Sequence, residues 1–72
     1  MNTMNRNDAI REDNAALDEL ARISEELETI NLLIVHFRQR PRVIRKLAMI
    51  RARLLIAKSD ALARRHAAGA YV

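Results

Sequence analysis

Large apolar residues recur at alternating steps of three and four along two stretches of this chain, and Pro41 separates the two stretches. Such spacing is typical of a helix that presents one apolar line to a neighbouring helix. No alternating strand pattern competes with it, so the sequence predicts two helices and an all-α fold. The first line is Leu20, Ile23, Leu27, Ile30, Ile34 and Phe37, and the second is Val43, Leu47, Ile50, Leu54, Ala57 and Ala61.

The two apolar lines are in phase with each other when the chain is folded back at Pro41. Facing residues of two antiparallel helices have residue numbers with a constant sum, and here that sum is 77. The short connection favours antiparallel neighbours. We therefore predict an antiparallel, coiled-coil-like two-helix hairpin. Its facing pairs are Ile34/Val43, Ile30/Leu47, Leu27/Ile50, Ile23/Leu54, Leu20/Ala57 and Ala16/Ala61, followed by the oppositely charged Asp13/Arg64.

Capping residues set the expected ends of the two helices. Asn7 is the expected N-cap of the first helix, with Thr3 and Asn5 as alternatives. Pro41 suits the first turn of the second helix, and Gly69 suits its C-terminal cap. The expected segments are a flexible N-terminus at 1–7, a hairpin at 8–66 (helix 8–37, turn 38–41, helix 42–66) and a frayed tail at 67–72 that includes Tyr71.

A second apolar stripe lies beside the predicted contact line, on one flank of the hairpin. The other flank carries Glu12, Glu19, Glu26, Lys46, Arg53 and Asp60, and is expected to be solvated. An exposed apolar stripe requires a partner, and we expect a second copy in a twofold four-helix bundle, or the helix of another protein. The stripe comprises Ile10, Leu17, Ala21, Leu32, Val35, Ile44, Ala48, Leu55 and Leu62, and its expected contact residues are Leu17, Val35, Ile44, Leu55 and Leu62.

The net charge of +4 hides a division between the two halves of the chain. Residues 1–28 hold eight Asp/Glu against three Arg, a net charge of −5, and residues 29–72 hold ten Arg/Lys against Asp60 alone, a net charge of +9. The two halves can attract each other within one chain. The basic excess indicates an acidic partner surface or a phosphate backbone.

Eight basic residues form the expected anion- or partner-binding set. Five surround the turn, where a helix N-terminus disfavours cations for folding but binds anions well. Three recur every seven residues beside the apolar stripe. Two plainer interpretations stay open: a solubilising turn, and side chains that cover apolar surface or pair with Asp13, Glu25 or Glu28 of a second copy. The set is Arg38, Arg40, Arg42, Arg45 and Lys46 at the turn, and Arg51, Lys58 and Arg65 beside the stripe.

No pattern of catalytic, metal-binding or cofactor-binding residues is found. His36 and His66 lie thirty residues apart, and no His and acid accompany Ser24 or Ser59. The longest apolar run is too short for a membrane span. The absence of cysteine excludes disulfides and suits the cytoplasm. We expect neither a cofactor nor a small-molecule substrate.

These features favour a small non-enzymatic interaction protein that acts as a regulator, inhibitor or adaptor. Its expected partners are a second copy and a protein with an acidic or helical surface. A basic hairpin dimer that binds RNA or DNA through its turn is the alternative, although no recognisable DNA-binding module or aromatic stacking platform is present.

Overall fold

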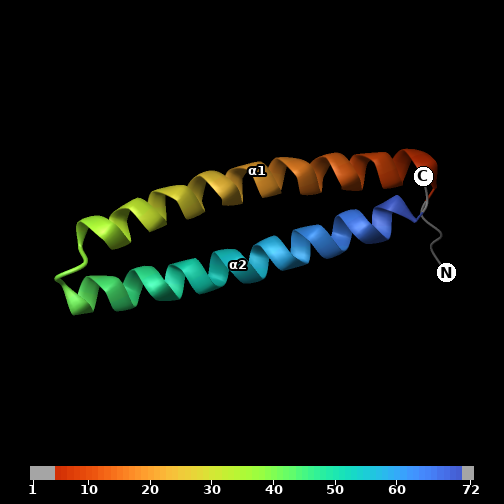
Figure 1. The fold of residues 1–72 in the computed structure, drawn as a ribbon. Helices are drawn as coiled ribbons and strands as arrows, with labels where there is room; N and C mark the ends of the chain where they lie inside the picture. The colour runs from red at the N-terminus through yellow and green to blue at the C-terminus, as the bar shows by residue number, and fades with distance from the viewer. Residues whose placement is uncertain (1–4, 71–72) are drawn as a thin grey trace.

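Two long helices pack against each other along the whole molecule in the computed structural model, which describes residues 5–70 (Figure 1). Helix α1 spans Arg6–His36 and helix α2 spans Pro41–Gly69. The hairpin measures 52 × 20 × 12 Å. No strand occurs within the described residues, so the all-α prediction and the pairing of the two helices are confirmed.

The N-cap of helix α1 lies two residues before the predicted one. The side chain of Asn5 accepts a hydrogen bond of 2.8 Å from the backbone N–H of Asp8, and this makes Asn5 the N-cap. Asn7 lies inside the helix. The preference for Asn7 is therefore wrong, because an asparagine also stands two residues earlier, where its carbonyl reaches the third helical residue.

Replacing Asn5 by alanine is expected to lower the free energy of unfolding by about 0.5–2 kcal/mol, because one N–H of the first turn loses its acceptor. Asn7→Ala is the matched control and should change it by no more than about 0.5 kcal/mol, since alanine is a better helix former. Urea unfolding followed by circular dichroism measures both. A larger loss for Asn7→Ala would contradict the cap at Asn5.

The turn and the C-terminal end also differ in detail from the prediction. Helix α1 closes with the backbone N–H of Phe37 donating to Leu33 O at 2.8 Å, and α2 starts at Pro41 itself. Gly69 is helical, and the capping residue is Ala70 in a right-handed conformation, so no left-handed glycine ends α2. The tail predicted as frayed is helical as far as Gly69, while residues 1–4 and Tyr71 lie outside the described residues.

The buried core is a ladder of residues spaced seven apart on each helix. We call these residues and their half-buried member Leu54 the core ladder. Their burial fits the predicted register, in which facing residues have numbers with a sum of 77. The alternate layers are less well covered, since Leu27 is half-buried and the side chain of Ile50 is 43% exposed. Two helices alone bury the residues on one line of contact, and the residues on either side of that line stay partly exposed to solvent. The core ladder consists of Ala9/Ala68, Ala16/Ala61, Ile23/Leu54 and Ile30/Leu47.

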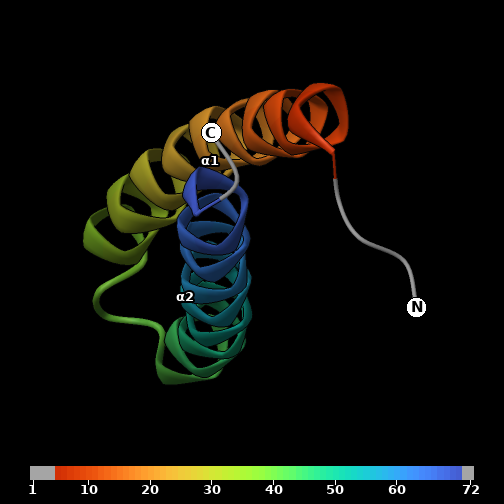
Figure 2. The same ribbon diagram turned by 90° about the vertical axis from the view of Figure 1, so that its right-hand side faces the viewer.

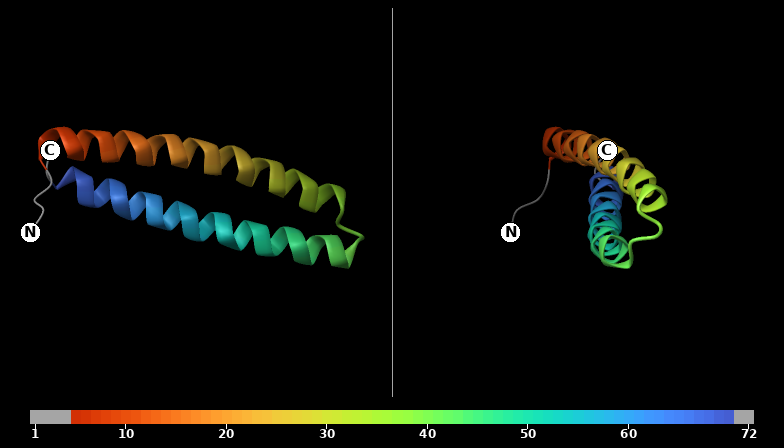
Figure 3. Two further views of the ribbon diagram at one scale, coloured as in Figure 1. Left: turned by 180° about the vertical axis from the view of Figure 1, so that it is seen from behind. Right: turned by 90° about the vertical axis from the view of Figure 1, so that its left-hand side faces the viewer.

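The size of the core-ladder residues changes along the hairpin. Alanines fill both sides of the two layers near the termini, whereas isoleucine and leucine fill the two layers nearer the turn. The two helices run side by side from the turn to the termini (Figure 1), and the reverse view in Figure 3 shows the same arrangement. Small side chains allow a closer approach of two helices, since the distance between the helix axes depends on the residues at their contact. Figure 2, viewed from the end, shows that α1 curves across α2 and is not strictly parallel to it.

Candidate functional site

One flank of the hairpin carries a continuous apolar surface. Ile10, Leu17, Leu55 and Leu62 each directly follow a core-ladder residue, which turns them about 100° away from the line of contact. Because the helices are antiparallel, this rotation brings all four to the same flank, where each is 40–47% exposed. Ile44 is half-buried on the same side. We call Ile10, Leu17, Ile44, Leu55 and Leu62 the apolar face.

Half-buried residues of α1 extend the apolar face toward the line of contact. Leu20, Leu27 and Ile34 each lie four residues after a core-ladder residue, so they turn about 40° toward the same flank. Their partial exposure means that the hairpin leaves part of its own predicted contact line uncovered. An added layer on this flank would bury both groups together.

Two members of the predicted stripe lie farther out. Val35 is at the outer edge of this flank, five residues after Ile30, and Leu32 points away from α2, two residues after Ile30. Leu32 is accordingly 73% exposed. The stripe predicted from sequence is therefore broader than the surface that one partner layer can cover.

The three basic residues beside the apolar face do not form a uniform set. Arg51 and Lys58 are exposed, and neither takes part in an ion pair among the described residues. Arg65 is half-buried and its Nε lies 2.9 Å from Oδ1 of Asp13, an acid that the prediction placed opposite Arg64. Arg51 and Lys58 thus stay available for a partner, whereas Arg65 helps to join α1 to α2.

Arg64 pairs instead with Glu19 on the opposite flank. Each of these two residues lies three positions after a core-ladder alanine, Ala61 and Ala16, and this spacing turns them away from the apolar face. The predicted Asp13/Arg64 pair is wrong for this reason, since these two residues turn to different flanks.

Breaking the Asp13–Arg65 ion pair is expected to have a small effect. Both side chains keep 32–41% of their surface exposed, and an ion pair in that environment contributes about 0.2–1 kcal/mol. A double-mutant cycle with Asp13→Asn and Arg65→Gln should give a coupling energy in that range, and the coupling should fall at high salt. A coupling above about 2 kcal/mol would show that this end of the hairpin is less hydrated than its exposure indicates.

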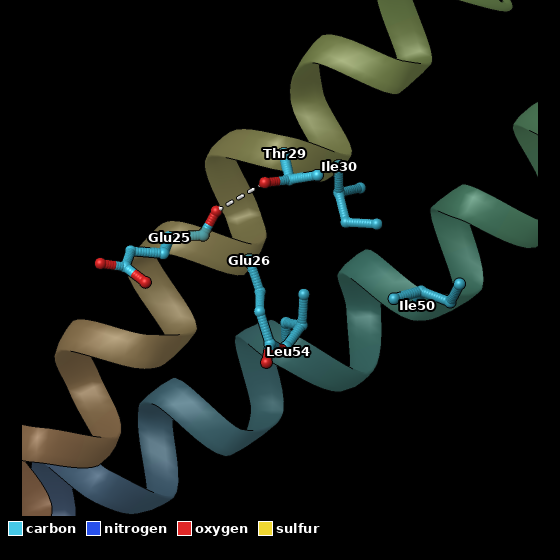
Figure 4. Close-up of a pocket in the computed structure, with 6 residues that line it drawn as sticks. All are labelled: Glu25, Glu26, Thr29, Ile30, Ile50 and Leu54. Atoms are coloured by element: carbon cyan, nitrogen blue, oxygen red, sulfur yellow. Dashed lines mark hydrogen bonds between the residues drawn. The ribbon is translucent and has the colours of Figure 1, made fainter.

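The opposite flank is mainly charged, as predicted, but it contains a groove that the sequence did not reveal. Glu25, Glu26 and Thr29 of α1 border it, with Ile50 and Leu54 of α2 across from them (Figure 4). The groove opens where the Ile50 layer is poorly covered. Glu26 faces Leu54 there and makes no ion pair among the described residues with Lys46 or Arg53, its expected neighbours.

Two large exposed residues of α2 were not singled out from the sequence. Met49 and Ile56 are 60% and 64% exposed and lie two residues after Leu47 and Leu54. That spacing points them away from α1, on neither edge of the contact line. A calculation of helical angle for each residue would have separated them from the apolar face.

The turn gathers positive charge with no acid nearby. Its five basic residues are all exposed, none takes part in an ion pair among the described residues, and no Asp or Glu occurs between residues 29 and 59. Arg40 is the N-cap of α2 without a side-chain hydrogen bond to the helix, and the first turn of α2 contains no acid. A shallow groove at this end is lined by Gln39, Arg40, Pro41, Arg42, Val43 and Arg45.

Other chemistry finds little support in the described part of the chain. His36 stacks edge-on against Phe37 with ring centroids 4.7 Å apart, while His66 lies at the far end of the hairpin. Among residues 5–70, no three His, Asp or Glu side chains form a group that would hold a metal ion. Neither helix contains a stretch that is apolar and long enough to cross a membrane.

Comparison with known proteins adds no relative to this picture. No model of a protein family, no curated protein and no solved structure matches the chain. Its function has to be inferred from the exposure, charge and packing of its own residues. Two surfaces stand out on those grounds, the apolar face and the basic turn.

Proposed function

We propose that this chain is a small non-enzymatic interaction protein that pairs with a second copy and docks on a partner protein, as a regulator, inhibitor or adaptor. The observation that carries the proposal is the apolar face: four large side chains are 40–47% exposed on one flank of a hairpin whose other flank is charged. Contiguous apolar surface of this kind marks a contact site for protein.

The small size of the core supports the same proposal. The core ladder has only four layers, and alanines fill two of them. Small domains bury a low fraction of their surface and are marginally stable alone. A partner layer would cover the five residues of the apolar face and also Leu20, Leu27 and Ile34, and each large aliphatic side chain that becomes fully buried contributes about 1.5–3 kcal/mol.

A partner protein is tested by affinity purification with the intact chain as bait. The same purification with Leu55→Asp should lose a partner that binds the apolar face, whereas Ile56→Asp, on the outer surface of α2, should retain it. The mass of each bait in solution has to be measured in parallel, because Leu55→Asp also separates a pair of copies. Recovery of equal amounts of partner with both variants would show that the partner does not bind the apolar face.

A second candidate function is binding of RNA or DNA through the turn. The specific observation that favours it is the group of five exposed Arg/Lys at one tip of the hairpin, none of them ion-paired among residues 5–70. Such a tip attracts a phosphate backbone through charge, without reading base sequence.

Replacing Arg42 and Arg45 by alanine should weaken binding to most nucleic-acid sequences alike and reduce the slope of log affinity against log salt by about 2. The matched control is Arg11→Ala with Arg22→Ala, which removes the same charge from exposed positions of α1. Electrophoretic mobility shifts or fluorescence anisotropy at several salt concentrations measure the slopes. No retention of the intact chain on RNA or DNA at low salt would dismiss this candidate.

A further inference from the structure

The charges of the two helices indicate how a second copy is oriented. We infer, on the basis of the proposed pairing through the apolar face, that the two hairpins lie face to face with their turns at the same end. In this arrangement α1 of each copy packs on α2 of the other, and the twofold axis runs along the hairpin. The two basic turns then form one composite cationic end.

The helices carry opposite net charges along their length. Helix α1 holds eight Asp/Glu against three Arg, a net charge of −5, and α2 holds eight Arg/Lys against Asp60, a net charge of +7. Two aligned hairpins with twofold symmetry pair either unlike helices or like helices across the interface. Pairing unlike helices places an acidic helix over a basic one twice.

The positions of Arg51 and Lys58 decide between the two arrangements. Both lie on α2 beside the apolar face, four residues after Leu47 and Leu54, so they turn toward an incoming layer. If α2 packed on the α2 of a second copy, these cations would lie against a helix with a net charge of +7 in a partly dehydrated interface. Over the α1 of a second copy they approach a helix with a net charge of −5, in which the exposed Glu28, five residues after Ile23, lies at the outer edge of the same flank.

The apolar residues are also compatible with this orientation. By the register of the hairpin, Leu17 is level with residue 60 of α2, and Leu62 lies two residues away, or about 3 Å along the axis. Leu62 of one copy therefore lies over Leu17 of the other. Ile44 in the same way comes level with residue 33, beside Ile34.

The composite end brings the two turns together at a cost. Both sets of five Arg/Lys would share one end of the dimer, but these side chains are exposed and reach into water. Salt screens charges in water over about 8 Å, whereas charges inside an interface are screened much less. Repulsion between the turns is therefore the smaller penalty, and a polyanion that contacts both turns would remove it.

Single cysteines test the orientation cleanly because the chain contains none of its own. A mixture of Leu17→Cys and Leu62→Cys, oxidised with diamide, should give a disulfide-linked heterodimer. Leu55→Cys alone should stay unlinked, because α2 helices diagonal to each other in a bundle are about 14 Å apart, beyond the disulfide limit of about 7 Å. Ala52→Cys mixed with Leu17→Cys is the control for random collision, since Ala52 lies eight residues, or about 12 Å along the axis, from the level of Leu17.

Each outcome decides the orientation or the pairing itself. A linked heterodimer of the Leu17→Cys and Leu62→Cys chains, without a linked homodimer of Leu55→Cys, supports the arrangement. A linked homodimer of Leu55→Cys, with or without the heterodimer, overturns it, because that link requires contact between the two α2 helices. A dimer in solution whose Leu17→Cys and Leu62→Cys mixture links no more than the Ala52→Cys control also overturns the orientation. Sedimentation velocity on the intact chain tests whether two copies pair at all, separately from their orientation. A monomer up to about 100 µM, together with linking no greater than in the Ala52→Cys control, would overturn the proposed pairing as well.

A variant that does not depend on disulfide formation gives a second test. Arg42→Gln with Arg45→Gln should tighten self-association at low salt by about threefold or more, because like charges leave the composite end. If the turns lay at opposite ends, each would lie beside the acidic start of α1, and the same variant would leave self-association unchanged or weaken it. Inorganic polyphosphate should tighten self-association of the intact chain and have little effect on the variant.

Discussion

Ile30→Asp is expected to unfold the hairpin at room temperature. Ile30 is 8% exposed and faces Leu47 in the core-ladder layer nearest the turn, so the carboxylate would be largely cut off from water. Removing the buried side chain alone costs about 2–5 kcal/mol, and burying a charge adds several more. A domain of this size has roughly 5 kcal/mol to lose. Circular dichroism at 222 nm should show the loss of helix.

Leu32→Asp is the matched control, because it makes the same change two residues along the same helix. The side chain of Leu32 is 73% exposed and points away from α2, so the new carboxylate stays hydrated. Its unfolding midpoint should differ little from that of the intact chain when both are measured at equal concentration, since self-association would shift the midpoint. Comparable losses from both variants would mean that the Ile30/Leu47 layer does not form the core.

Leu55→Asp is expected to abolish self-association while the hairpin stays folded. Leu55 is 41% exposed in the single chain, and its cover in the proposed pair would come from the second copy. An unpaired carboxylate in such an interface costs several kcal/mol, and each 1.4 kcal/mol changes a dissociation constant about tenfold. The dissociation constant should therefore rise by roughly 100-fold or more in sedimentation velocity, with the helical signal retained.

Ile56→Asp provides the comparison for this variant. Ile56 is the next residue and is more exposed, at 64%, but it turns toward the outer surface of α2. Self-association should be unaffected, because neither proposed contact includes that side. Loss of pairing in Ile56→Asp with retention in Leu55→Asp would move the interface to the outer surface, where Met49 also lies.

The architecture was predictable because two independent patterns agreed. Apolar spacing indicated the two helices, and the constant sum of facing residue numbers indicated their register, which the core ladder from Ala9/Ala68 to Ile30/Leu47 retains. The helix ends were less predictable. Asn5 and Asn7 have the same capping chemistry, and only the backbone geometry distinguishes them.

The candidate site was predictable in its location but not in its details. The spacing of Leu17, Leu55 and Leu62 relative to the contact line was enough to place them on one flank. Spacing alone could not say that Arg65 is held by Asp13, since that depends on which flank each long side chain reaches. Nor could spacing show that Ile50 stays 43% exposed. The apolar line includes Ile50 and Leu47 alike, but a single pair of helices buries only Leu47.

The taper from alanine layers to isoleucine and leucine layers means that cohesion is unevenly distributed along this rod. A methyl group contributes much less to burial than a branched four-carbon side chain, so the terminal layers separate more easily than those beside the turn. The two helices can thus separate at the end that carries the chain termini while the layers beside the turn stay packed. The alanine layers lie next to the Asp13–Arg65 and Glu19–Arg64 ion pairs, and these pairs join α1 to α2 where the apolar contact is weakest.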